Sequence, residues 1–180
     1  MEEWNQARAS NRRIEDMQRI AMDALEFADD EGPAFERYAQ KNRLTLNEVV
    51  YFLNAYEAGG LAGLQAIRNP DIIPADVAQN AVRVIKKMLN TDIGARVPLR
   101  ITDEGTAIGV HEIQQRGNGD QYLFPTCQFR LSIEENIWHL YWMRKFDAWW
   151  PYSAPTTGHK YSLRARIQQV LDDEHGCFWG

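Results

Sequence analysis

The N-terminal part of the chain carries hydrophobic residues at helical spacing. Intervals of three and four residues form one apolar stripe: Ile14, Met17, Ala21 and Leu25. This spacing predicts an amphipathic helix with one buried face. A second, shorter helix is expected to begin at Pro33, because proline is well placed as the first residue of a helix.

A third helix is predicted from a strong local start signal. Thr45-Leu46-Asn47-Glu48 has the spacing of a capping box, and Leu44 with Val49 forms a hydrophobic staple around it. The helix is expected to end at Gly59-Gly60, because glycine adopts the left-handed conformation that stops a helix. Pro74 opens a fourth helix, whose apolar face carries Ala78, Val82, Ile85 and Leu89.

From Val97 the hydrophobic period changes to two, which is the period of half-buried strands. Five strands are predicted, over residues 97–101, 108–115, 122–131, 137–143 and 149–152. Ser162 then caps a final helix over residues 163–171. Consecutive hairpins imply a mostly antiparallel sheet with this helix packed on one face.

Composition and charge narrow the function classes. The net charge is −5 and the sequence pI about 5.4, which argues against a general polyanion binder and leaves room for one local basic patch. Cys127 and Cys177 are too few for a disulfide framework. No apolar signal core or long apolar run is present, so we expect a soluble, cytoplasmic protein with no membrane partner.

The second half of the chain resembles the bacterial family known as domain of unknown function 3024. The matching residues are Glu104-Gly105, Glu112, Phe124-Pro125, Phe129-Arg130, Trp138, Leu140-Tyr141-Trp142, Arg144, Trp149, Tyr152 and Gly176-Cys177-Phe178-Trp179-Gly180. The resemblance covers residues 97–180, and Trp150 stands where the family pattern has a basic residue or histidine. It implies a fold unit and no reaction.

The first half resembles a helix-turn-helix domain of the insertion-element transposase kind over residues 33–67. The corresponding first helix, turn, recognition helix and glycine motif are residues 34–40, 41–44, 45–56 and Gly59-Gly60-Leu61-Ala62-Gly63-Leu64. Asn42 occupies the position where such turns carry glycine, and asparagine also adopts the left-handed conformation.

The expected fold is therefore α+β. A helical domain with a helix-turn-helix-like core spans residues 1–94, and a small antiparallel sheet with a C-terminal helix spans residues 95–180. In the helical domain, the candidate DNA-binding residues are Arg37, Lys41, Arg43, Asn47, Tyr51, Asn54 and Arg68. Asn47, Tyr51 and Asn54 are expected to face bases, while the cations contact phosphates.

These features favour a non-enzymatic, DNA-associated or regulatory binding protein with double-stranded DNA as its partner. The recognition helix contains no arginine or lysine and one acid, Glu48. The alternative is therefore a protein-interaction adaptor, alone or as a homodimer, whose helix-turn-helix does not bind DNA.

The tryptophan-rich hairpin has two interpretations. The candidates for a partner surface are Trp138, Trp142, Trp149, Trp150 and Tyr152. Stacked aromatics bind single-stranded bases when a basic groove accompanies them, and few cations lie near this hairpin. Cross-strand aromatic packing within the sheet is the favoured interpretation. Because strand residues alternate, Trp138, Leu140 and Trp142 are expected on the face opposite His139 and Tyr141.

Catalytic and metal chemistry are weakly represented. Glu112, with Asp103 and Gln114 nearby, allows a metal-dependent nuclease as a third hypothesis. A zinc site would have to gather His175, Cys177, His159 and Cys127, but only one close pair of ligands is present. We therefore expect no catalytic residue, no metal and no cofactor.

The C-terminal tail, residues 176–180, is predicted to fold onto the sheet domain. Chain ends fray unless something holds them, and a free tail would expose the rings of Phe178 and Trp179 to water. Contact of one of these rings with Trp138, Trp142 or Trp149 is expected.

Overall fold

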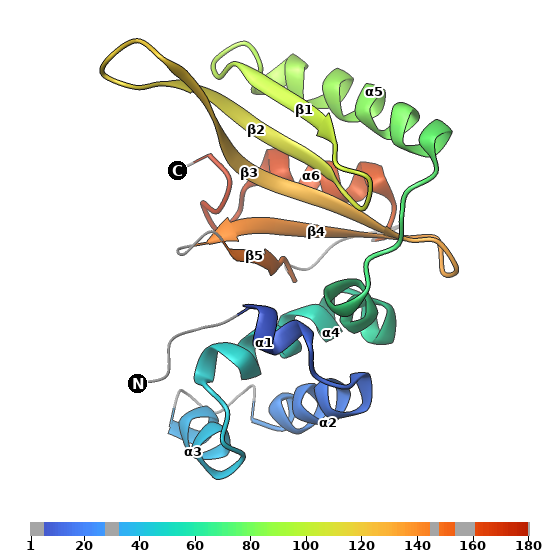
Figure 1. Cartoon of the computed structure of the whole chain (residues 1–180), viewed down its shortest axis with the longest axis vertical. Coiled ribbons are helices and arrows are strands. Elements are labelled where there is room, and N and C mark those ends of the chain that lie inside the picture. Colours follow the sequence, from blue (N-terminus) through green and yellow to red (C-terminus); the bar gives the residue numbers. More distant parts are fainter. Residues whose placement is uncertain (1–5, 28–32, 145–147, 154–160, 180) are drawn as a thin grey trace. The chain divides into compact units, whose positions relative to one another are not determined.

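The computed structural model describes residues 6–27, 33–144, 148–153 and 161–179. The helices are α1 Gln6–Ser10, α2 Ile14–Leu25, α3 Pro33–Lys41, α4 Leu46–Arg68, α5 Ala75–Asp92 and α6 Leu163–Asp172 (Figure 1). The strands are β1 Leu99–Asp103, β2 Ile108–Gln115, β3 Gln121–Ser132, β4 Ile137–Arg144 and β5 Ala148–Pro151. The fold is α+β, as the hydrophobic periods predict.

The chain divides into two compact units. The helical unit comprises the described residues of 1–69 with 151–153, and the sheet unit comprises those of 70–150 and 161–179. The sequence placed the division at residues 94 and 95, whereas the contacts divide the chain between Asn69 and Pro70. The difference is α5, which packs on β1, β2 and α6.

The helical unit is built around the packing of α2 against α4. Its fully buried apolar side chains include Met17, Ile20, Val49, Phe52 and Leu64. Met17 belongs to the predicted stripe of α2, and Val49 lies at the predicted staple position. The local signals of the sequence therefore identify the core faces of both helices.

A break at Gly59-Gly60 divides α4, where the sequence predicts a helix end. Gly60 has φ +59°, a left-handed conformation that glycine adopts without steric cost. After the break the chain returns closely on the first part of α4. A Cβ atom on Gly63 would overlap the carbonyl oxygen of Ala55, so this approach also requires glycine.

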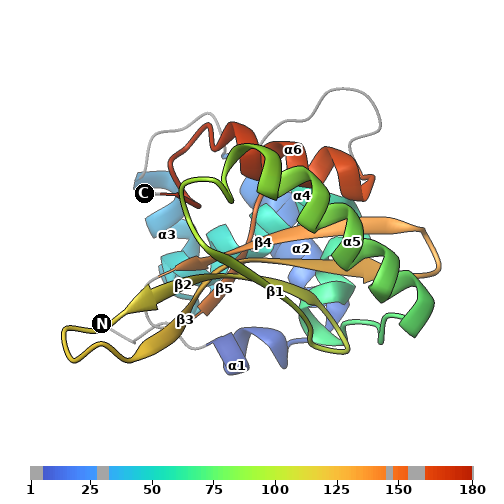
Figure 2. The same ribbon diagram turned by 90° about the horizontal axis from the view of Figure 1, so that it is seen from above.

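The sheet is an antiparallel meander in the order β1-β2-β3-β4-β5. Helices α5 and α6 lie side by side on one of its faces (Figure 2). The Ser162 hydroxyl accepts a hydrogen bond from the N–H of Ala165 at 3.2 Å, so the predicted cap of α6 is confirmed. The buried apolar side chains of this unit include Ile85, Leu89, Ile108, Phe129, Leu140 and Ile167.

Strand register separates an apolar face from a polar face. On β3 and β4 the apolar pairs are Cys127↔Trp142, Phe129↔Leu140 and Leu131↔Trp138. The pairs between them are Gln128↔Tyr141, Arg130↔His139 and Ser132↔Ile137. The predicted separation of Trp138, Leu140 and Trp142 from His139 and Tyr141 is therefore confirmed.

The C-terminal tail is folded, and one carboxylate holds it. Asp173 accepts hydrogen bonds from the backbone N–H groups of Cys177 (2.6 Å), Phe178 (3.1 Å) and Trp179 (3.0 Å). The indole N–H of Trp179 donates to the carbonyl oxygen of Val170 at 2.7 Å, and Phe178 is buried. The folded tail confirms that prediction, while contact with the tryptophans of the hairpin stays a prediction.

Candidate functional site

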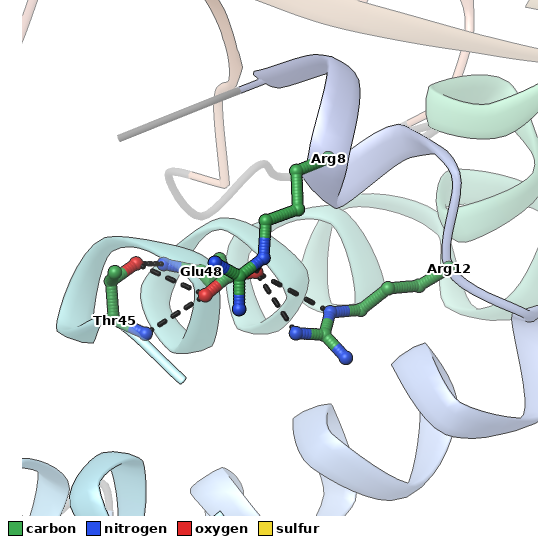
Figure 3. A network of polar contacts seen from close by, with 4 residues as sticks. All are labelled: Arg8, Arg12, Thr45 and Glu48. Carbon is green, nitrogen blue, oxygen red and sulfur yellow. Dashed lines mark hydrogen bonds and ion pairs between the residues drawn. The ribbon is translucent and has the colours of Figure 1, made fainter. Parts of the chain in front are cut away.

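The start of α4 is organised by Glu48 (Figure 3). The Thr45 hydroxyl accepts from the Glu48 N–H at 3.1 Å, and the Thr45 N–H donates to Glu48 Oε2 at 2.8 Å. These two reciprocal bonds form the predicted capping box, which is confirmed. Arg12 donates to Glu48 Oε1 from Nη2 at 3.1 Å and from Nε at 3.4 Å. Arg8 lies at 3.6 Å from the same oxygen.

This network removes Glu48 from the surface. Only 3% of its side chain is exposed, and both carboxylate oxygens accept from the chain. The arginines keep more contact with water, with 45% of Arg8 and 27% of Arg12 exposed. The sequence predicted the cap but gave no sign that two distant arginines would neutralise it.

The predicted DNA-binding residues divide by exposure. Five of them are exposed: Arg37, Lys41, Arg43, Asn47 and Arg68. Asn54 is half-buried. Tyr51 is fully buried, with its ring 6.0 Å from that of Phe52 in an edge-to-face arrangement. In this conformation Tyr51 is a core residue and cannot reach a base.

The turn between α3 and α4 differs from expectation at one residue. The left-handed residue is Arg43, with φ +54°, and not Asn42. Asn42 instead donates from Nδ2 to the carbonyl oxygen of Tyr38 at 2.9 Å, which closes the end of α3. An arginine in this conformation is strained by about 1 kcal/mol relative to glycine.

None of the five candidate partner-surface aromatics is exposed. Trp138, Trp150 and Tyr152 are buried, and Trp142 and Trp149 are half-buried. The guanidinium of Arg144 lies 4.5 Å from the ring centroid of Trp150 and 5.7 Å from that of Trp142. Trp150, the departure from the family pattern, therefore packs beneath an exposed cation. These five rings form no open platform for bases.

The residues considered for a nuclease do not converge. Asp103 pairs with Ile108 at one end of the β1–β2 ladder, and Glu112 pairs with Leu99 at the other. Asp103 accepts from the Gly105 N–H at 2.9 Å, and Glu112 accepts from Gln114 at 2.9 Å. Both carboxylates are engaged locally, so the nuclease hypothesis gains no support from their positions.

The residues considered for zinc are also separate. Cys127 is buried in β3, where burial raises the pKa of its thiol. Cys177 is half-buried in the tail, and His175 is exposed. His159 lies outside the described residues. Within the part of the chain that the structure describes, no three His, Cys, Asp or Glu side chains group as metal ligands.

The polar face of the sheet holds a cluster that the sequence analysis did not single out. Glu104 Oε1 accepts from the Thr102 hydroxyl at 3.0 Å and lies 3.1 Å from His111 Nε2. The Gln128 amide donates to Glu104 Oε2 at 2.6 Å. Register explains the convergence, because Thr102 pairs with Gly109 and Gly109 pairs with Gln128. We call Thr102, Glu104, His111 and Gln128 the Glu104 cluster.

A cation continues the cluster toward β4. Arg130 donates to Gln128 Oε1 at 3.3 Å, and its guanidinium lies 4.0 Å from the ring centroid of Tyr141. Burial raises the pKa of the Tyr141 hydroxyl, and Arg130 opposes that shift. The Glu104 cluster, Arg130 and Tyr141 therefore form one connected row across four strands.

A buried histidine lies at the end of this face. His139 Nε2 is 2.8 Å from the Ser132 hydroxyl. Burial lowers the pKa of His139 to about 3, helped by the positive charges of Arg166 and Arg130. The imidazole is therefore neutral at physiological pH. Its Nδ1 has no hydrogen-bond partner among the described residues, which leaves the pair without the third group that would orient a catalytic base.

One signal in the sequence could have found the Glu104 cluster. Glu104-Gly105, Arg130 and Tyr141 all belong to the motif that carries the family resemblance. Counting alternate strand positions inward from the turn at Gly105 places Thr102 and His111 on one face. Glu112 and Asp103, the carboxylates predicted as nuclease candidates, lie on the other face of the ladder.

The fold and the two polar networks define an α+β protein with a capped helical unit and a five-stranded meander backed by two helices. The chain belongs to the family described as domain of unknown function (DUF3024), whose model matches residues 72–180, more than half of the sequence. No curated protein and no solved structure matches the chain. No helix within the described residues has the length and apolar character needed to cross a membrane.

The family match extends the resemblance beyond its predicted start at residue 97. It includes α5, in agreement with the packing of that helix on the sheet. It does not reach residues 33–67, and nothing in these comparisons supports the transposase-type resemblance of that segment, which stays a prediction.

Proposed function

We propose that this chain is a non-enzymatic, DNA-associated protein whose helical unit contacts duplex DNA through α3, the following turn and the first part of α4. The observation that carries the proposal is the inward position of Glu48. As the one acid predicted in the recognition helix, it would repel phosphates if it were exposed. Its burial and its neutralisation by Arg8 and Arg12 remove that obstacle.

The exposed cations supply the attraction. Arg37 and Lys41 are four residues apart on α3 and share a helical face. Arg43 follows in the turn, and all three are exposed. Contacts of this kind position a protein on DNA without reading its sequence.

Base reading in this proposal is limited. Asn47 is exposed near the start of α4, and Asn54 is half-buried two turns later. Asparagine can pair with adenine in the major groove, but two such side chains offer few contacts. We therefore expect affinity to come mainly from phosphates, with weak sequence preference and strong salt dependence.

A binding assay with duplex DNA at several salt concentrations tests the proposal. Lys41→Glu and Arg43→Gly should weaken binding to all duplex sequences alike. Arg43→Gly should also reduce the salt slope by about one unit, because one phosphate contact is lost. Lys86→Glu and Lys87→Glu, which change exposed residues of α5, serve as matched controls and should bind as the parent does.

Arg43→Gly separates lost binding from lost folding. Because Arg43 is left-handed, glycine should raise the stability of the unit by up to about 1 kcal/mol. A variant that is more stable and binds DNA less cannot be explained by unfolding. If no duplex binds the parent chain at low salt, the proposal fails.

A cleft favours the adaptor as the second candidate function. It has a volume of about 600 Å³ and lies between α3 and the start of α4, lined by Glu36, Ala39, Gln40, Leu44, Thr45, Leu46 and Asn47. Leu46, one of the lining residues, is 41% exposed. Leu46→Asp should abolish capture of a protein partner while leaving phosphate-driven DNA binding only modestly weaker. Loss of DNA binding alone after Lys41→Glu favours the first candidate.

A further inference from the structure

Three side-chain atoms of the Glu104 cluster form a closed triangle. Thr102 Oγ1 lies 3.0 Å from Glu104 Oε1 and 3.0 Å from His111 Nε2. His111 Nε2 lies 3.1 Å from Glu104 Oε1. The three atoms come from β1, the residue that follows it and β2, and they stand in one nearly equilateral arrangement.

Linear hydrogen bonds cannot occupy all three sides of this triangle. The ionised carboxylate carries no proton, the Thr102 hydroxyl has one, and His111 Nε2 has at most one. Two protons cannot make three linear hydrogen bonds. A proton shared across a corner of the triangle would also be poorly aligned with both acceptors. At least one side of the triangle is therefore left without a linear hydrogen bond of its own.

A cation would contact all three atoms at once, through a lone pair of the carboxylate, one of the hydroxyl and one of a His111 imidazole that carries its proton on Nδ1. In a six-coordinate site with metal–ligand bonds of about 2.1 Å, neighbouring ligand atoms lie about 3.0 Å apart. The observed sides of 3.0, 3.0 and 3.1 Å match one face of such an octahedron. A carboxylate, an imidazole and a hydroxyl together suit a first-row transition cation, since imidazole is a poor ligand for Mg²⁺.

The surroundings of the triangle have the features of a supporting shell. Gln128 donates to Glu104 Oε2 at 2.6 Å, which fixes the carboxylate and leaves Oε1 toward the triangle. Arg130 donates to the other end of that amide at 3.3 Å and so orients it. Gly109 lies beneath, where a Cβ atom would overlap Glu104 Oε1 and lie 2.7 Å from His111 Nε2.

Charge and access also fit a cation. Among the described residues, no lysine or arginine lies within ion-pair distance of Glu104. The side chains of Glu104 and His111 are 31% and 14% exposed, so water can reach the remaining positions of an octahedron.

We propose that Thr102, Glu104 and His111 form one face of a binding site for a six-coordinate divalent first-row transition cation, of which Mn²⁺ is the type. Gln128 is the positioning residue for the carboxylate. The site is independent of DNA binding by the helical unit. It comprises two side chains of the usual ligand types and one hydroxyl, with water completing the shell.

Titration of the full chain with MnCl₂, followed by the loss of the electron paramagnetic resonance signal of free Mn²⁺, tests the site. One Mn²⁺ per chain should bind. Glu104→Gln and His111→Gln should each weaken binding at least about 100-fold, and Gln128→Ala about 10- to 100-fold. Thr102→Val keeps the shape of the side chain and should weaken binding about 10-fold or more.

Two controls make the result specific. Glu134→Gln and His175→Gln change exposed residues of the same unit and should bind Mn²⁺ as the parent does. Ca²⁺, which needs longer bonds, should not displace Mn²⁺ at equal concentration. Absence of Mn²⁺ binding by the parent chain would overturn the proposal. So would unchanged binding by Glu104→Gln or His111→Gln variants whose circular dichroism shows them to be folded.

Discussion

Two glutamates, one in each unit, show how surroundings decide what a carboxylate does. Glu48 is 3% exposed, accepts hydrogen bonds from Thr45 and Arg12 and forms an ion pair with Arg8, so the chain itself satisfies both of its oxygens and cancels its charge. Glu104 is 31% exposed and meets a hydroxyl, an imidazole and an amide. Its charge has no arginine or lysine partner among the described residues.

The difference separates a structural role from a binding role. Removing one partner of a buried ion pair leaves an uncompensated charge and costs stability. A partly exposed carboxylate that meets a hydroxyl, an imidazole and an amide costs less to remove, because water replaces what is lost. We therefore expect Glu48 to matter for the fold and Glu104 to matter for a ligand.

The largest effect is expected at a third carboxylate, which resembles Glu48. Asp173 holds three backbone N–H groups of the C-terminal tail, and Phe178 is buried. Deleting residues 176–180 should lower the free energy of unfolding by about 3–4 kcal/mol, since a Phe-sized side chain alone contributes about 1.5–3 kcal/mol. Chemical denaturation measures this loss.

Asp173→Ala sharpens the same prediction. It keeps every residue of the tail and removes only the acceptors, so about half of the loss is expected. If the truncated chain unfolds like the parent, Asp173 and the tail it holds do not stabilise the fold.

The next-largest effect concerns how the stability of the fold depends on pH, and it is expected at a histidine of the polar face. His139 is buried and neutral with a pKa of about 3, whereas an unfolded histidine titrates near 6.5. Because the folded pKa is depressed, its stability contribution is complete above about pH 6.5 and is lost as the pH falls toward 3. Stability should fall by about 1.4 kcal/mol per pH unit in that window from this group.

His139→Gln should flatten the acid limb of the stability profile, because it removes the group that takes up the proton. His111→Gln is the matched comparison on the same face. Urea unfolding at pH 7, 6, 5 and 4 measures both profiles. An unchanged acid limb in His139→Gln would contradict the assignment.

The smallest effect is expected at the helix cap. Thr45→Ala removes the acceptor for the Glu48 N–H but leaves the contacts of Glu48 with Arg8 and Arg12. A loss of about 1 kcal/mol is expected for a single cap. Thr45→Ser, which keeps the hydroxyl, should melt close to the parent. Equal melting temperatures for the alanine and serine variants would show that the arginines and the backbone N–H of residue 45 hold Glu48 without the hydroxyl.

The sequence predicted what is local and missed what depends on distant pairing. The caps at Thr45 and Ser162 and the break at Gly59-Gly60 follow from neighbouring residues, so they were predictable. The Glu104 cluster depends on register across three strands. A shift of one residue would move those side chains to opposite faces.

Long-range contacts also explain the other differences. The pattern of α5 shows an apolar face but not which unit covers it. Tyr51 was expected to face bases together with Asn47 and Asn54, yet it is buried. The partners of Glu48 come from α1 and from the segment between α1 and α2, more than thirty residues earlier along the chain.

The contrast between the two glutamates is tested most directly by one paired measurement. The free energy of unfolding of Glu48→Gln and Glu104→Gln is determined by denaturant titration, with and without Mn²⁺. Glu48→Gln should lose about 2–3 kcal/mol in both conditions, somewhat below the range for a fully buried pair because its arginines stay partly solvated.

Glu104→Gln should lie within about 1 kcal/mol of the parent without Mn²⁺ and should lack the stabilisation that Mn²⁺ gives the parent. The contradicting result has two parts: Glu104→Gln is as unstable as Glu48→Gln without metal, and Mn²⁺ stabilises the parent and the Glu104→Gln variant equally. In that case Glu104 is a structural carboxylate, and the distinction between the two glutamates is wrong.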